Sequence, residues 1–192
     1  PILAPGVELA YPCSVTSIRI PAVTEALPAA LHASGDRSIT LAPETGNDEL
    51  RWKMGKHVPN ALLLEKVRLI AKAGFTQLKL YFLIGLPGET LENVRSTLHP
   101  AAEVRGIFKE QARTSGVMGH LHLGTNILVP KPYTPWQRHP MAPERELREK
   151  IALLQKGAAR MPNVSLGQLS IKQAVWQTYI SKAGSDAAEA LE

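Results

Sequence analysis

The chain has 192 residues, 44% of them hydrophobic and 20% charged, a balance typical of a globular protein that can bury a core. No apolar run is long enough to cross a membrane, and the N-terminal sequence lacks the basic start and apolar centre of a signal peptide. These features predict a soluble, cytoplasmic protein. The formal charge of +5 fits an anionic ligand or nucleic acid, although solubility alone also explains it. The chain begins without Met, so we expect it to be part of a longer one.

Strand and helix patterns alternate along the first two thirds of the sequence. Alternating β-branched residues predict a strand at 15–23, and Thr24 is expected to cap a helix that ends at Gly35. Pro100 is expected to break or kink a helical segment at 90–113. The other elements of this part are strands at 38–43, 76–86 and 119–130, a short helix within 44–57, and a helix that Asn60 caps and Gly74 ends.

This alternation predicts an α/β fold with a parallel βα-repeat sheet and helices outside it. The run at 76–86 is almost continuously apolar, which predicts a strand covered on both faces.

A proline-rich turn at 131–143 precedes two further predicted helices, at 144–160 and 170–181. The expected inward residues are Leu147, Ile151 and Leu154 in the first helix, and Ile171, Val175 and Tyr179 or Ile180 in the second. We expect three parts: 1–14 as a linker or remainder of a missing N-terminal half, 15–135 as a partial barrel, and 136–192 as a C-terminal helical extension.

Ligands of parallel α/β proteins lie at the carboxyl ends of the strands. One such end carries the sequence GLPGET at 85–90. It is not a Walker phosphate loop, because no Gly-Lys-Ser/Thr follows, and it is not GxGxxG. Glycine lets the backbone approach a flat ligand, and Thr90 can cap the next helix so that its amides face the pocket. A purely structural turn explains the same spacing.

Charged residues follow the strand at 38–43. Glu44 can accept hydrogen bonds from a sugar hydroxyl or an ammonium group, and capping a helix is its alternative role. Arg51, Lys53, Lys56 and His57 lie close together, and such a group more commonly forms a solvated face. Lys56 is the best candidate to bind a carboxylate or phosphate, because it follows a glycine where a helix should end.

His120 and His122 share one face of their predicted strand, since the side-chain period of a strand is two residues. Two histidines placed in this way can chelate a metal. They lie at the start of the strand, however, opposite the expected site.

Four stretches together resemble the second half of a radical S-adenosylmethionine (radical SAM) domain. SITLAPETGNDELRWKMGK resembles the family's fourth strand with its acid-glycine exit, and LKLYFLIGLPGET resembles the fifth strand and its loop. VPKPYTPWQ resembles the sixth strand, and a helix ending in AKAG stands between the first two stretches. The resemblance covers about residues 15–182 and implies strands three to six of a partial TIM barrel. The helices from 144 onward resemble a subgroup that often carries an upstream cobalamin-binding domain.

The resemblance implies S-adenosylmethionine as the cofactor and assigns roles to matching positions. Glu44 corresponds to the contact with the ribose or methionine part, and Lys56 to the contact with the methionine carboxylate. Gly85 and Leu86 correspond to the loop over the adenine, and Val129 and Pro130 to the strand whose backbone reads the adenine edge. In complete family enzymes a reduced 4Fe–4S cluster supplies the electron that generates a 5′-deoxyadenosyl radical.

The family binds this cluster through a CxxxCxxC loop, whereas the present sequence has one cysteine, Cys13. The first two barrel strands are also missing. We therefore expect one wall of a cofactor site, inactive alone, that pairs with the missing N-terminal half of a longer oxidoreductase or methyltransferase. The substrate stays unknown.

Two other functions fit the sequence. The chain could be a non-catalytic α/β interaction module, or a metal-dependent barrel hydrolase that uses His120 and His122. We also expect self-association through the exposed edge of the strand at 15–23.

Overall fold

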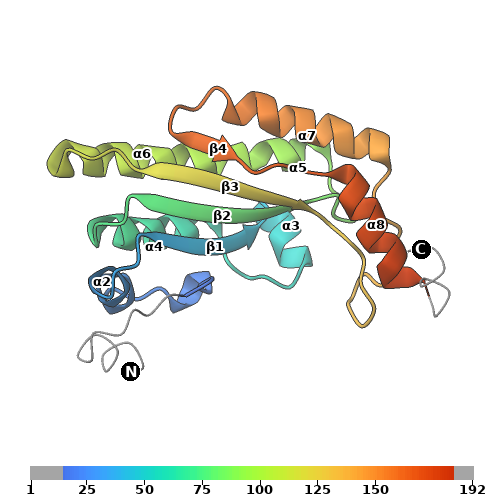
Figure 1. The fold of residues 1–192 in the computed structure, drawn as a ribbon, viewed down its shortest axis with the longest axis horizontal. Coiled ribbons are helices and arrows are strands. Elements are labelled where there is room, and N and C mark those ends of the chain that lie inside the picture. Colours follow the sequence, from blue (N-terminus) through green and yellow to red (C-terminus); the bar gives the residue numbers. More distant parts are fainter. Residues whose placement is uncertain (1–14, 184–192) are drawn as a thin grey trace.

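The computed structural model describes residues 15–183, so Cys13 and the predicted linker at 1–14 lie outside the described residues. Within that range the protein has an α/β fold whose four strands are all parallel and ordered β1-β2-β3-β4 (Figure 1). The strands are β1 (Ser38–Glu44), β2 (Gln77–Ile84), β3 (His120–Ile127) and β4 (Val164–Leu166). The crossover helices are α4 (Asn60–Lys72) between β1 and β2, α5 (Leu91–Ser96) and α6 (Leu98–Ser115) between β2 and β3, and α7 (Glu144–Ala158) between β3 and β4. This arrangement confirms the predicted α/β fold with a parallel βα-repeat sheet.

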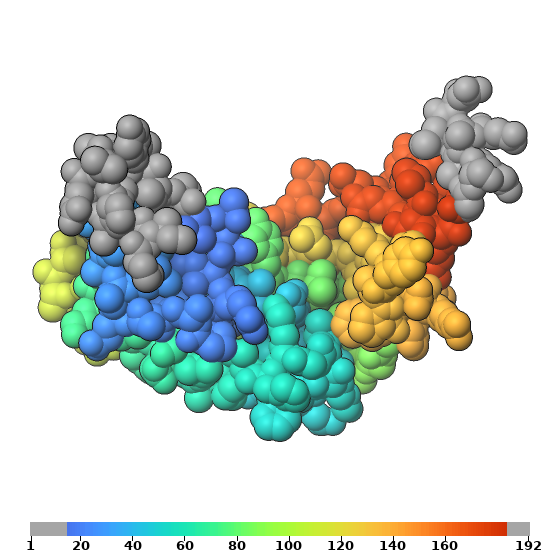
Figure 2. Space-filling model, turned by 90° about the horizontal axis from the view of Figure 1, so that it is seen from below, coloured from blue at the N-terminus to red at the C-terminus, as the bar shows by residue number. Residues whose placement is uncertain are grey.

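Helices cover one face of the sheet and leave the other open. The main core joins buried strand residues to α4 and α6; it includes Leu41, Leu80 and Leu123 from the sheet, Val67 and Ile70 from α4, and Val104 and Phe108 from α6. Along β2 the burial alternates, and Tyr81 is 39% exposed between the buried Leu80 and Phe82. The expectation of a strand covered on both faces is therefore wrong: the apolar run includes residues that face the open side. Figure 2 shows the molecule hollowed between its first helices and α8 (Ile171–Lys182).

The predicted strand at 15–23 is reduced to one point of pairing. Ile18 forms a parallel bridge with Leu41, and its N–H donates to the Thr40 carbonyl at 3.0 Å. The chain then turns into the 3₁₀ helix η1 (Ile20–Ala22), with Pro21 in its first turn. Because proline has no N–H to give to a ladder, extended pairing stops here.

Helix α2 (Ala26–Ala33) and α3 (Asp48–Lys53) confirm the two shorter predicted helices. Two predicted caps are wrong. Glu25, not Thr24, is the N-cap of α2, and Pro59 precedes α4 as its N-cap. Asn60 is the first residue of α4, and its amide instead donates to the Gly46 carbonyl at 2.7 Å.

The break expected from Pro100 is present. Helix α5 ends at Ser96 and α6 begins at Leu98, which places Pro100 in the first turn of α6, where its missing N–H costs little. No helix in the stretch from residue 15 to residue 183 is long and apolar enough to span a membrane.

The C-terminal part differs from its prediction in two ways. It contributes the short strand β4, which pairs with β3 at the edge of the sheet. In α8 only Ala174 is buried, whereas Val175, Tyr179 and Ile180 are each 44–46% exposed. The expected inward positions of Val175 and Tyr179 or Ile180 are thus wrong. Leu147 and Leu154 of α7 are buried as predicted, and Ile151 is partly buried beside them.

Candidate functional site

Three strand exits meet in one apolar cluster at the carboxyl end of the sheet. Leu50, from the segment after β1, packs there with Leu86 and with Leu128, which follows β3. The Leu128 N–H donates to the Ile84 carbonyl at 2.9 Å, which keeps the exits of β2 and β3 together. Met54, Leu83 and Trp136 lie at the margin of the cluster. The fold therefore places a buried apolar cluster, which includes Leu86, beneath the strand exits where the sequence predicted a ligand.

Glu44 and Lys56 form an ion pair at the exit of β1. Lys56 Nζ pairs with Glu44 Oε1 and also donates to the Ala42 carbonyl at 2.9 Å. Glu44 has a φ of 66°, at an irregularity in the β1–β2 register, so its carboxylate leaves the regular pleat of the strand. The Lys56 side chain is 42% exposed and that of Glu44 is 20% exposed. The two predicted charges thus neutralise each other and stay accessible to a ligand.

The loop between them is built around Arg51, whose side chain is 0% exposed. The guanidinium donates to the carbonyls of Pro43 at 2.8 Å and Val58 at 2.6 Å, and also to that of Thr45. It pairs with Asp48 at 2.7 Å. Burial lowers the pKa of Arg51, while Asp48 acts in the opposite direction. The sequence interpretation of Arg51 as part of a solvated face is therefore wrong, because this guanidinium fixes the backbone around Glu44.

The glycine loop after β2 is held closed by Glu89. Gly85 has a φ of 78°, and its N–H donates to Glu89 Oε2 at 2.7 Å. The Glu89 N–H donates to the Leu86 carbonyl at 3.0 Å. Thr90 forms a capping box with Asn93 at the start of α5, as its predicted capping role requires. The carboxylate of Glu89 thus stays inside the loop.

A lysine from α7 completes this arrangement. Lys150 Nζ lies 2.9 Å from Glu89 Oε2, and the two side chains are 1% and 2% exposed. Burial raises the pKa of Glu89, and the hydrogen bond and charge of Lys150 counteract that rise. Sequence reasoning missed both residues. The acid within GLPGET was a visible signal for Glu89, but nothing local marks Lys150, which is 61 residues away.

Val129 and Pro130 were expected within the strand at 119–130, but β3 ends at Ile127, so both follow it and lie outside the apolar cluster. Val129 packs with residues of α7 in a second cluster, and Pro130 is buried. Neither has a polar side chain, so any hydrogen bond that they form with a ligand must involve the backbone, and Pro130, which has no N–H, can only accept one.

His120 and His122 converge on one hydroxyl group on the open face of the sheet. His120 Nε2 lies 2.9 Å from Ser165 Oγ, and His122 Nδ1 lies 3.0 Å from the same oxygen. Residues 15–183 contain no group of three or more histidines, cysteines or acids placed to hold a metal ion. Burial lowers the pKa of His122, and the charges of Lys79 and His120 lower it further. The Ser165 hydroxyl therefore engages both imidazole rings that the sequence offers as metal ligands.

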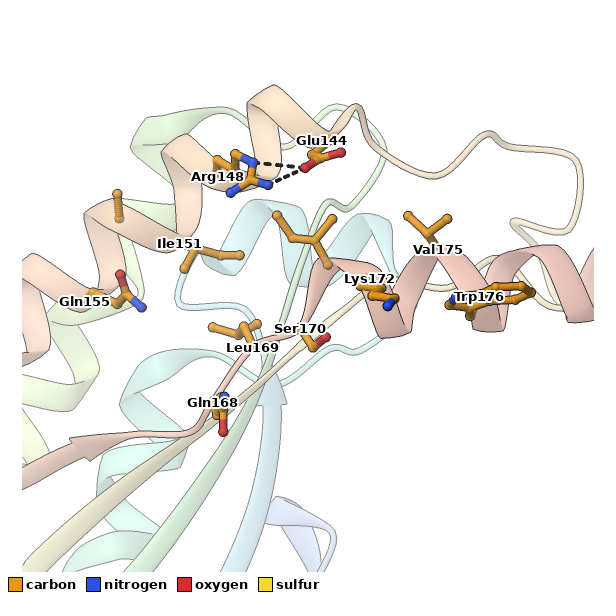
Figure 3. Close-up of a pocket in the computed structure, with 12 residues that line it drawn as sticks. Glu144, Arg148, Ile151, Gln155, Gln168, Leu169, Ser170, Lys172, Val175 and Trp176 are labelled. Carbon is orange, nitrogen blue, oxygen red and sulfur yellow. Dashed lines mark hydrogen bonds and ion pairs between the residues drawn. The ribbon is translucent and has the colours of Figure 1, made fainter.

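Two cavities differ in their relation to these residues. One of about 450 Å³ lies beside β1 and is lined by Arg19, Ala42, Lys56 and His57, so it adjoins the Glu44–Lys56 pair. A larger one of about 710 Å³ lies between α7 and the start of α8 (Figure 3). Its walls include Arg148, paired with Glu144, and the exposed Trp176. No predicted site residue lines this second cavity.

Comparisons with known proteins identify the family of this chain. The model of the radical SAM superfamily matches residues 5–101, about half of the chain. An uncharacterized protein of the archaeon Methanocaldococcus jannaschii is 26% identical over 101 residues. That match covers 53% of this chain and 20% of the relative, so the matched part of the chain spans about a fifth of the relative's length. With the family match over strands β1 and β2 and their exits, the chain belongs to the radical SAM superfamily.

Proposed function

We propose that this chain forms the part of a radical SAM site that holds the adenine, ribose and methionine carboxylate of S-adenosylmethionine. The observation that carries the proposal is the meeting of three strand exits in one apolar cluster, together with the Glu44–Lys56 pair at the exit of β1. Ligands of parallel α/β sheets bind at such exits. The family membership supplies the identity of the ligand.

Each group has a part of the cofactor that it suits. The side chains of Leu86 and Leu128 are buried in the cluster, so they support from below the strand exits on which a flat base would lie. Glu44 can accept hydrogen bonds from ribose hydroxyls or from the methionine ammonium group, and Lys56 can bind the carboxylate. Because the two side chains already pair, we propose that the ligand's ammonium and carboxylate replace their mutual contact. Gly85, Val129 and Pro130 complete the adenine side through their backbone.

The residues of this chain do not fit the iron–sulfur cluster of the family. Such a cluster needs several cysteine thiolates, and the sequence has one cysteine. We therefore propose that the 192 residues do not generate the radical alone, and that an N-terminal half of the same cytoplasmic polypeptide supplies the cluster. Within the present chain, residues 15–135 form the barrel part and 136–192 extend it. An upstream cobalamin-binding domain in the parent is a further part of this proposal.

A non-catalytic interaction module is the second candidate, and the single cysteine is the observation that favours it. The two functions differ in whether the parent protein binds S-adenosylmethionine. The histidine-based hydrolase gains no support, since Ser165 engages both rings and the described residues offer no third ligand.

The test is calorimetric binding of S-adenosylmethionine to the full-length protein and to its Lys56→Ala variant. We expect the variant to bind more weakly by about 1–3 kcal/mol, the usual effect of losing a hydrogen bond to a charged group. Lys53→Ala is the matched control, because Lys53 is 69% exposed and pairs with Glu49 away from the cavity. Full affinity in Lys56→Ala would contradict its role, and no binding by the wild type would favour the interaction module.

A further inference from the structure

The C-terminal helix α7 reaches the glycine loop through buried charges. Lys150 makes an ion pair with Glu89 Oε2 at 2.9 Å and donates to the Glu89 backbone carbonyl at 3.0 Å. The same Oε2 accepts the N–H of Gly85 at 2.7 Å. One carboxylate oxygen therefore joins the first residue of the loop to a lysine of α7.

Apolar contacts fix the same loop against the same part of the chain. A Cβ placed on Gly85 would lie 3.0 Å from Leu147 Cδ2 and 3.2 Å from Ala142 Cβ. Leu147 is fully buried and packs with Ile84, the last residue of β2. The loop thus has no room to shift toward α7, and the Glu89–Lys150 pair keeps it from moving away.

The charges are arranged so that the loop depends on the lysine. A buried carboxylate without a partner is strongly unfavourable, and breaking a buried pair leaves an uncompensated charge. If Lys150 were absent, the folded protein would lower its free energy if Glu89 turned toward water or took up a proton. The first change would remove the acceptor of the Gly85 N–H, and the second would weaken it.

We propose that Lys150 is a positioning residue of the ligand site: through Glu89 it holds the 85–90 loop in the shape that binds the adenine. The inference rests on the proposed function for the identity of the ligand. It assigns a role in that site to α7, which lies beyond the family match at residues 5–101. The C-terminal extension then contributes to the ligand site through α7.

Four variants of the full-length protein separate positioning from stability alone. Lys150→Met removes the charge and keeps most of the length, and Glu89→Ala removes the acceptor. The double variant Glu89→Gln/Lys150→Met removes the ion pair but keeps a side-chain carbonyl for the Gly85 N–H. Glu146→Gln is the control, because Glu146 also pairs with Lys150 but is 42% exposed, and its ion pair does not involve the 85–90 loop.

Two measurements are made on each variant, well below its unfolding temperature. Hydrogen exchange of the Gly85 amide needs no ligand, and we expect it to accelerate at least about tenfold in Lys150→Met and Glu89→Ala. S-adenosylmethionine affinity should fall by about tenfold in the same two variants and recover in the double variant. The control should match the wild type in both measurements.

The outcomes distinguish this inference from the proposed function. Lower thermal stability with unchanged Gly85 exchange and unchanged affinity would overturn the positioning role. If the wild type binds no S-adenosylmethionine, the proposed function fails, and the Gly85 exchange alone decides whether Lys150 holds the loop. If the double variant stays as impaired as Lys150→Met in both measurements, Lys150 does not act through the Gly85–Glu89 contact.

Discussion

Tyr81 lies over Gly124, its neighbour across the β2–β3 ladder, so closely that a Cβ on Gly124 would come within 2.3 Å of the ring. This pair sits on the open face of the sheet, where Tyr81 is 39% exposed. Gly124 is therefore needed because a side chain at this position would collide with the Tyr81 ring, and not because the backbone turns there.

Replacing Gly124 with alanine should destabilise the protein by about 1–3 kcal/mol, the usual cost of inserting a methyl group into a filled space. In a Tyr81→Ala background the same change should be neutral or favourable, since alanine suits a strand better than glycine. Urea unfolding of the four proteins of this cycle measures the coupling. Gly106→Ala in α6 is the control, because nothing lies within 4 Å of its added Cβ. Equal costs with and without the Tyr81 ring would contradict the contact.

Arg51→Met should destabilise the protein by about 3–5 kcal/mol, as breaking a buried charged network does. The reason is that three carbonyls, of Pro43, Thr45 and Val58, lose their donor. Arg51→Lys should recover little, because an ammonium group cannot reproduce the guanidinium's fixed set of five donors. Lys53→Met, in the same helix and 69% exposed, should leave the denaturation midpoint unchanged. A small effect of Arg51→Met in urea unfolding would show that water replaces these hydrogen bonds.

The outer edge of β1 should support self-association. Among the described residues Ile18 forms the one strand-like bridge with this edge, and Lys56 and Arg51 donate to the carbonyls of Ala42 and Pro43, so another strand would pair with the remaining backbone groups of β1. The edge expected at 15–23 is replaced by that of β1, because residues 20–22 turn away as a 3₁₀ helix. Light scattering of the 192-residue chain at several concentrations should show an average mass that rises with concentration. A monodisperse monomer at all concentrations would contradict this expectation.

The sequence predicted the parallel sheet and the meeting of the strand exits because both follow from short-range patterns and a general rule. Strand and helix periodicities gave β1, β2 and β3, and the carboxyl-end rule placed Glu44, Lys56 and Leu86 in one region. It could not show that Glu44 and Lys56 pair with each other. That contact depends on the positive φ of Glu44 and on the path of the whole loop.

The missed residues depend on contacts between distant segments. Lys150 pairs with a carboxylate 61 residues away, and a lysine in a charged helix gives no local sign of burial. The wrong prediction of the inward residues of α8 has a related cause. Val175 and Tyr179 follow helical spacing, but spacing does not say whether another part of the protein covers that face of the helix. Proline explains the shortened pairing at 15–23, since Pro21 has no N–H for a strand ladder.

The hydrogen bonds that join His120 and His122 with Ser165 tie β3 to the short edge strand β4, and they predict a pH-dependent stability. The pKa of His122 is lowered from its ordinary value of 6.5 by burial and by the nearby charges of Lys79 and His120. At a pH between the lowered pKa of the folded state and the ordinary pKa of 6.5, the unfolded chain binds a proton at His122 that the folded chain does not. Stability should therefore fall as the pH drops below about 6.5, and this contribution should level off below the folded-state pKa.

Urea midpoints measured from pH 8 to pH 5 test this dependence. His122→Gln should reduce the loss of stability in this range, because glutamine keeps a hydrogen-bonding group near Ser165 without titrating. His99→Gln is the control, since His99 lies in α6 away from this group and has an exposed side chain. If His122→Gln loses as much stability as the wild type between pH 7 and pH 5, then groups other than His122 set the pH dependence.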